Sequence, residues 1–207
     1  MCKTIETSLS TFIFTLTCAI ISVKICKTKE VFFAAVLMFT ISIMQLVDAG
    51  IWRSIHTKNN KLNEYLSRYA IPITLSCQLL VSYFGVNLLF GWQNQYFVYG
   101  LAAFVIFTLT YWPYKCTSNT FTDTDGYLYW CRMTVNHIVI LLYNLFLFVP
   151  IFVGIPSRYT IIKYILLIPI VTTLIINYTK TSFCSRWCWS SNITSLLVLA
   201  YSIYTKT

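Results

Sequence analysis

An apolar run that ends in Trp52 and Arg53 constrains this chain more than any other feature. The run 31–53, VFFAAVLMFTISIMQLVDAGIWR, contains Asp48 as its only charged residue before the closing arginine. About 20 such residues in a helix cross the ~30 Å hydrocarbon core of a bilayer. A soluble domain carries about 25% charged residues, whereas this chain of 207 residues has 10% charged and 57% hydrophobic residues. The sequence therefore predicts an integral membrane protein.

Apolar runs separated by short polar connections fill the whole chain, without a linker, a repeat or a low-complexity tract. We therefore predict one all-α domain over 1–207, a polytopic transmembrane helix bundle with spans at 10–26, 31–52, 69–91, 96–112, 137–154, 159–177 and 188–204. Six spans instead of seven are the alternative, if the short first or last run lies at the membrane surface. Pro113 is expected to stop the fourth span, and 53–68 is expected to be a polar connection.

Basic residues indicate one orientation in the membrane. With seven spans, the N-terminus and the second, fourth and sixth connections share one side. That side has more basic residues, which favours a cytoplasmic N-terminus by the positive-inside rule. They are Lys3, Arg53, Lys58, Lys61, Arg68, Lys115, Arg132, Lys180 and Arg186, against Lys24, Lys27, Lys29, Arg158, Lys163 and Lys206 on the other side.

Four loop cysteines on the first of these sides indicate the opposite orientation. They are Cys116, Cys131, Cys184 and Cys188. Disulfides between them would require an oxidising compartment. Free thiols suit the sequence equally well, and a zinc site with four thiolate ligands is a third interpretation, although the spacing matches metal-binding knuckles poorly. The orientation stays open at this point.

Tryptophans are also concentrated on that side. They are Trp52, Trp112, Trp130, Trp187 and Trp189. Interfacial tryptophans normally lie at both membrane surfaces. The one-sided distribution therefore indicates either a folded cap on the loop-rich face or an uneven belt of interface aromatics.

Polar side chains inside the predicted spans are the candidates for a functional pocket. They are Gln45, Asp48, Gln78, His137, Asn144 and Asn192. Gln45 and Asp48 share one helix face. Asp48 and His137 both fall within about one turn of the cysteine-bearing side, so they could meet. Such a set forms a polar pocket or proton relay, or it only supplies hydrogen bonds between helices.

Known catalytic patterns do not occur in the sequence. We find no HExxH, GxSxG, phosphate-binding GxxxxGK[ST] or dinucleotide-binding GxGxxG motif. Two histidines, His56 and His137, are too few for a histidine-based metal centre. We therefore predict neither an enzyme nor a cofactor. The net charge of +9 arises in short connections rather than in a basic stripe, so nucleic acid is not predicted as a partner.

Three segments, MFTISIMQLVDAGIW, DTDGYLYWCR and SRWCWSSN, resemble an uncharacterised family of small multi-span membrane proteins found in large DNA viruses and some protists. That family has Met-Gln, an acidic residue and Trp in an early helix, then Gly-His-Leu-x-Trp and Gly-Ser-x-Trp-Cys segments. Here Tyr127 occupies the histidine position, and Ser185-Arg-Trp-Cys188 lacks the glycine. The resemblance implies a seven-helix protein of a virion internal membrane or host endomembrane and no activity.

These patterns favour a structural or interaction component of a membrane, which presents its Trp- and Cys-rich loop face to a protein partner. A homo-oligomer is compatible with them. The alternative is a small-solute or proton transporter, channel or receptor that uses a polar pocket centred on Asp48. Convergence of the polar side chains on one cavity would favour the alternative, whereas separate contacts between helices would favour the interaction component.

Overall fold

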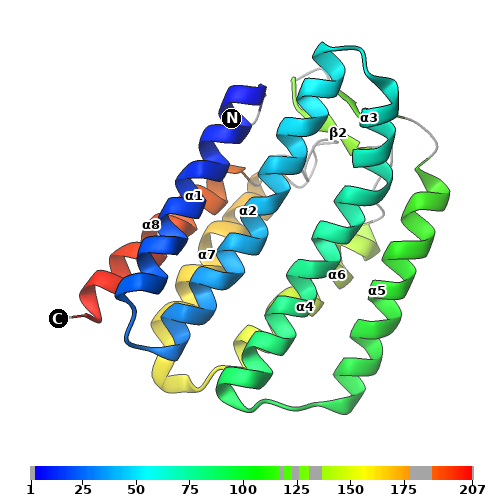
Figure 1. The fold of residues 1–207 in the computed structure, drawn as a ribbon. Helices are drawn as coiled ribbons and strands as arrows, with labels where there is room; N and C mark the ends of the chain where they lie inside the picture. The colour runs from blue at the N-terminus through cyan, green and yellow to red at the C-terminus, as the bar shows by residue number, and fades with distance from the viewer. Residues whose placement is uncertain (1–2, 117–118, 123–125, 131–136, 178–187, 207) are drawn as a thin grey trace.

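The protein is a bundle of helices that run alternately up and down between its two ends (Figure 1). The computed structural model describes residues 3–116, 119–122, 126–130, 137–177 and 188–206, without the side chains of 137, 168–170, 172–177, 188 and 189. The first part of the bundle comprises α1 (Ile5–Ile25), α2 (Lys29–His56), α3 (Asn60–Tyr65), the π-helical turn η1 (Leu66–Ala70), α4 (Ile71–Phe90) and α5 (Gln95–Lys115). The rest comprises α6 (His137–Val149), the π-helical turn η3 (Pro150–Gly154), the 3₁₀ turn η4 (Ser157–Tyr159), α7 (Thr160–Asn177) and α8 (Cys188–Tyr204).

Helices occupy all the predicted apolar runs, so the all-α class is confirmed. Within the described residues, four helical segments are long and apolar enough to cross a membrane: Ile5–Ile25, Lys29–His56, Asn60–Phe90 and Gln95–Lys115. A fifth is counted if 138–154 and 157–167, which are bent by 115° relative to each other, form one broken span. The structure thus gives four to five candidate spans by length and composition.

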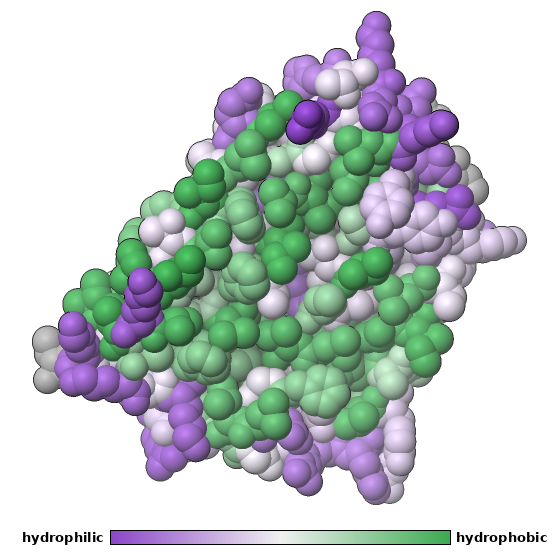
Figure 2. Space-filling view, viewed as in Figure 1, coloured by the Kyte–Doolittle hydropathy of each residue, from purple (hydrophilic) through white to green (hydrophobic). Residues whose placement is uncertain are grey.

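The surface is divided in the way that a membrane requires. Figure 2 shows apolar side chains across the middle of one face and hydrophilic side chains gathered at its ends. Large apolar side chains that point outward from the middle of the helices include Ile13, Phe39, Ile73, Phe84 and Ile106. In water, such a surface would promote aggregation, whereas lipid tails cover it without cost.

Two of the helix boundaries that differ from the predicted ones have a clear local cause. α1 begins at Ile5 rather than at residue 10, because Thr4 and Thr7 form a capping box in which each side-chain oxygen accepts the other residue's backbone N–H, at 3.2 and 3.1 Å. Pro113 does not stop α5, which continues to Lys115. Only one helical hydrogen bond is lost at a proline so close to the end, and the bond from Cys116 N–H to Trp112 C=O closes the last turn.

The expected polar connection 53–68 is mostly helical, which is the largest correction to the sequence-based fold. α2 continues to His56, and α3 begins only four residues later at Asn60. Asn59 makes this sharp restart possible, because its side-chain oxygen accepts the Leu62 N–H at 3.1 Å and thereby caps the new helix. The resulting helical segment, Asn60–Phe90, is longer than the bilayer core is thick, so its first part extends toward the polar end of the bundle.

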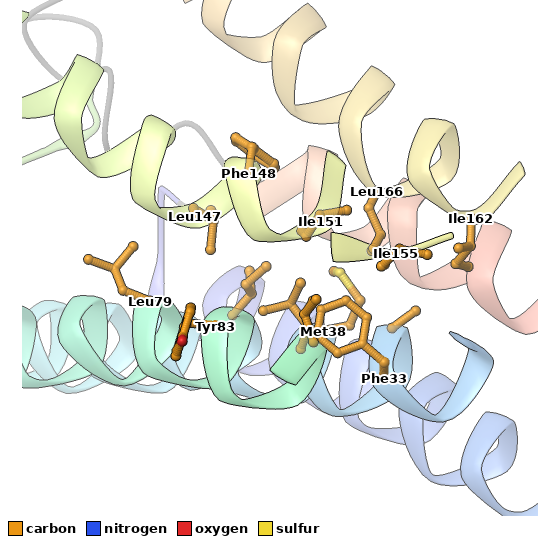
Figure 3. Close-up of a cluster of buried hydrophobic side chains, with 14 of the residues drawn as sticks. Phe33, Met38, Leu79, Tyr83, Leu147, Phe148, Ile151, Ile155, Ile162 and Leu166 are labelled. Atoms are coloured by element: carbon orange, nitrogen blue, oxygen red, sulfur yellow. The ribbon is translucent and has the colours of Figure 1, made fainter. Parts of the chain in front are cut away.

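α2 lies at the centre of the bundle between α1 and α4 (Figure 1), and residues around its whole circumference are buried. A helix that is apolar on every side is typical of such a central position. The main hydrophobic core joins Phe33 and Met38 of α2 to Leu79 and Tyr83 of α4 and to the α6–α7 region, as Figure 3 shows. Gly85 permits the close approach of α4 to α2, because an added Cβ would lie 2.8 Å from the Phe33 ring.

Candidate functional site

A folded loop covers the end of the bundle at which the N-terminus lies (Figure 1). This loop, which we call the loop cap, comprises Cys116, 119–122 and 126–130. Its two short strands, β1 (Phe121–Thr122) and β2 (Leu128–Tyr129), pair antiparallel. Gly126 adopts φ = +76°, a conformation that glycine reaches without steric cost. The Lys3 ammonium lies 4.7 Å from the centre of the Tyr127 ring, which links the N-terminal segment to the loop cap.

The first anchor of the loop cap is a buried amide on α3. Asn63 donates from Nδ2 to the backbone oxygen of Thr120 at 3.0 Å and accepts the Thr120 N–H on Oδ1 at 2.8 Å. Ser67 donates to the same Oδ1 at 3.1 Å, and its hydroxyl also lies 2.7 Å from the Thr120 hydroxyl. The Asn63 side-chain amide therefore bonds both the N–H and the C=O of Thr120, as the backbone of a neighbouring strand would. Since both backbone groups are buried, the pairing avoids the cost of unsatisfied polar groups.

The second anchor results from the π-helical turn η1. In this turn the Ile71 N–H bonds to Leu66 C=O, one residue beyond the α-helical acceptor. The corresponding donor for Ser67 C=O would be residue 72, which is a proline and has no N–H. The Trp112 indole N–H of α5 supplies the missing donor, at 3.0 Å from the Ser67 oxygen. The irregular turn thus creates a buried acceptor that holds the end of α5 beside the loop cap.

The third anchor uses Asp48, the one acidic residue inside the central predicted span. Trp130 of the loop cap donates its indole N–H to Asp48 Oδ1 at 3.2 Å. Both residues are buried, with 1% of Asp48 and 5% of Trp130 exposed. In the part of the chain that the structure describes, this intramembrane carboxyl group thus bonds a loop side chain, and the bond holds the loop against the bundle.

Apolar packing accompanies these hydrogen bonds in a second hydrophobic cluster. It contains Met44, Val47, Ile51, Trp52, Ile71, Trp112, Cys116, Leu128 and Trp130. Trp52, Trp112 and Trp130 thus face the protein interior, in contrast to the predicted belt of interface aromatics, because the loop cap encloses them. Tyrosines occupy exposed positions near this end instead, at Tyr65, Tyr69, Tyr111 and Tyr114.

The remaining polar residues of the predicted spans make separate contacts. Gln78 accepts a hydrogen bond from the Tyr143 hydroxyl and donates to Thr40 C=O at 3.5 Å, so it joins α4 to α6 and α2. Asn144 donates to Ile140 C=O within its own helix at 2.7 Å. Asn192 of α8 contacts two residues of α1, Thr15 at 3.2 Å and Thr11 at 3.4 Å.

Several predicted site residues lie outside what the structure describes. They are Cys131, Cys184 and Trp187, together with the side chains of His137, Cys188 and Trp189. Gln45 is described and is buried on the same helix as Asp48. Cys116 is disulfide-bonded, while the described cysteines Cys18, Cys26 and Cys77 are free. The described residues hold no group of three metal-ligating side chains. Because Cys116 is disulfide-bonded, it has no thiolate with which to bind zinc, which argues against the four-thiolate zinc site.

The chain matches no family model, no curated protein and no solved structure. The assignment of a role therefore depends on the geometry above. Among the described residues, the candidate pocket residues form distinct hydrogen-bonded groups: Asp48 with Trp130, Gln78 with Tyr143 and Thr40, and Asn192 with Thr11 and Thr15. This arrangement agrees with the interpretation in which the polar residues make separate contacts, and not with the one in which they converge on one cavity.

The residues that fix the loop cap most directly, Asn63, Ser67 and Thr120, were not among the residues predicted from the sequence. The first two lie four residues apart, which places them on one helix face, but only if the polar segment that contains them is helical. One feature indicates that helix in retrospect, because Asn59 is a favourable N-cap residue.

The link between Gln78 and Tyr143 allows a test of how much one interhelical hydrogen bond contributes. We expect Tyr143→Phe to lower the free energy of unfolding by about 0.6 to 1.7 kcal/mol, the range for such bonds in membrane proteins. The measurement is the melting temperature of the purified protein in detergent. The matched control is Tyr99→Phe, because Tyr99 is exposed. Equal melting temperatures of the two variants would show that the bond contributes nothing.

Proposed function

We propose that this protein is a non-enzymatic integral membrane protein of seven membrane-crossing helices, whose loop cap is a pre-formed docking surface for a protein partner. Four to five candidate spans support the membrane assignment. α8, with 17 residues, and the separation of α6 from α7 by a sharp bend extend the count to seven. The resemblance to a family from large DNA viruses leads us to propose a virion internal membrane or a host endomembrane as its location.

The observation that carries this proposal is the hydrogen bond from Trp130 to Asp48. An intramembrane carboxyl group is costly and usually indicates a transport path or a proton relay. Here its partner is a tryptophan of the loop cap, 82 residues away in sequence. The bundle thus uses its most costly polar residue to fix a loop outside the apolar band. A loop that is ordered in advance loses little conformational freedom when a partner binds, which increases affinity.

Replacement of Asp48 distinguishes this proposal from a proton transporter. In Asp48→Asn the amide oxygen still accepts the Trp130 N–H, so we expect the fold and the loop cap to persist. The measurement is proton entry into vesicles that contain a pH-sensitive dye. We expect wild type and Asp48→Asn to match protein-free vesicles. Proton flux in wild type that disappears in a folded Asp48→Asn protein would contradict the proposal and favour the transporter.

Asp48→Ala serves as the companion variant, because alanine cannot accept the indole N–H. A buried donor without an acceptor costs about 1 to 3 kcal/mol, so we expect the loop cap to detach more often. Trypsin cleavage after the exposed Lys115 measures this opening, and it should accelerate roughly tenfold in Asp48→Ala, since 1.4 kcal/mol corresponds to a factor of ten. Asp48→Asn should be cleaved at the wild-type rate.

A further inference from the structure

The two ends of the bundle differ in the state of their cysteines. At the loop-cap end, Cys116 immediately follows α5 and is disulfide-bonded. At the opposite end, Cys26 follows α1, is partly exposed and is free, with its thiol donating to Val23 C=O at 3.1 Å. Disulfides persist in oxidising compartments, whereas cytosolic thiols are kept reduced. Cys116 is 1% exposed, so its disulfide reflects the redox conditions under which the loop cap folded. Cys26 has no second described cysteine beside it, so its free thiol fits a reducing compartment without requiring one.

The two ends also differ in how their charges are balanced. The opposite end carries Lys24, Lys27, Lys29, Arg158, Lys163 and Lys206, and the acidic residue near them, Glu30, is 3% exposed. The one ion pair found among the described residues, Arg68 with Glu64 at 3.3 Å, lies at the loop-cap end. The opposite end therefore presents cations without an exposed acid beside them. Such a surface suits the anionic lipids of a cytoplasmic leaflet.

From these two differences we infer that the loop-cap end faces an oxidising compartment, outside the cell or inside an organelle, and that the opposite end faces the cytoplasm. The count of all basic residues in the sequence favours the reverse, by nine to six. That count is a statistical tendency, whereas a disulfide depends directly on the redox chemistry around it. The disulfide at Cys116 therefore decides the orientation, and the docking surface of the loop cap is exposed on the non-cytoplasmic side.

Two exposed lysines, one at each end, provide a matched pair of reporters. Lys61 lies on α3 beside the loop cap, and Lys29 begins α2 at the opposite end. In cells that express Lys61→Cys or Lys29→Cys, a membrane-impermeant maleimide is added before and after selective permeabilisation of the plasma membrane, and again after detergent. The labelled peptides are identified by mass spectrometry, which separates the new cysteine from the native ones.

We expect Lys29→Cys to react as soon as the reagent reaches the cytosol. Lys61→Cys should react in intact cells if the protein is at the cell surface, or only after detergent if it lies in an internal membrane. After denaturation, Cys116 should be alkylated only when a reductant has been added, and Cys26 without it. Reaction of Lys61→Cys from the cytosol, or alkylation of Cys116 without reductant, would overturn the inference.

The same experiment keeps this inference separate from the proposed function. Reaction of both reporters from one side would mean that α2, the long helix between them, does not cross the membrane, and it would overturn both the seven crossings and the orientation. The reverse sidedness, with Lys61→Cys cytosolic and Lys29→Cys protected, would overturn the orientation alone, because the seven crossings and the docking role of the loop cap would be unaffected.

Discussion

Gly154→Ala should lower the melting temperature of this protein more than the same replacement at any other glycine. A Cβ at this position would lie 2.3 Å from Val86 Cγ1 and 2.9 Å from Trp92 Cβ. These atoms belong to α4 and to the turn that follows it, and they cannot move away without displacing the helix. Overpacking of this kind costs about 3 kcal/mol, which corresponds to roughly 6 to 12 °C for a chain of this length.

Gly100→Ala is the matched control for this experiment, because it adds the same methyl group to another helical glycine. There the new Cβ would meet the Phe146 ring at 3.4 Å, at the edge of ordinary contact. Alanine also favours a helix over glycine by about 1 kcal/mol, so we expect Gly100→Ala to be neutral or slightly more stable. If Gly154→Ala melted at the same temperature as Gly100→Ala, the close packing of η3 on α4 would be wrong.

Asn63→Ala should release the loop cap while it leaves most of the helix bundle intact. Alanine cannot replace the two hydrogen bonds to the Thr120 backbone or the one from Ser67. Each buried group left without a partner costs about 1 to 3 kcal/mol. We therefore expect trypsin to cleave after Lys115 at least tenfold faster, a factor that requires 1.4 kcal/mol. The far-ultraviolet circular dichroism spectrum should remain that of the wild-type helices.

The matched control is Asn60→Ala, three residues earlier on the same short helix. Asn60 is exposed, and its side chain accepts one hydrogen bond, from Asn119 at 3.2 Å. Solvent replaces such a bond easily, so the cleavage rate should change little. Equal rates for Asn63→Ala and Asn60→Ala would indicate that the loop cap is held by the hydrophobic cluster and the disulfide alone.

The helices could be predicted from the sequence because a bilayer leaves the backbone almost no alternative. Every N–H and C=O group in lipid must be paired within its own segment, so an apolar run such as 31–53 becomes a helix whatever its neighbours are. The ends of these helices were harder to predict. The Thr4 capping box and the Asn59 N-cap each depend on one side chain, and mean apolarity over a long run does not detect either.

The partners of the polar residues could not be predicted in the same way. Helical spacing places Gln45 and Asp48 on one face, but it contains no information on which segment packs against that face. The residue that bonds Asp48 is Trp130, in a loop that has no periodic pattern. Likewise, Thr120 becomes important only after α3 has formed and brought Asn63 beside it. Contacts between segments far apart in sequence are a property of the assembled bundle.

The π-helical turn η1 also affects how this sequence should be compared with others. It accommodates one residue more than an α-helix would between the same two ends, and each residue turns a helix by about 100°. A helical wheel drawn without interruption from Asn60 to Phe90 therefore assigns the wrong face to one of its two halves. An alignment of this segment with a regular helix needs a gap of one residue between 66 and 71. A comparison that does not allow this gap will match apolar positions of α4 with polar ones.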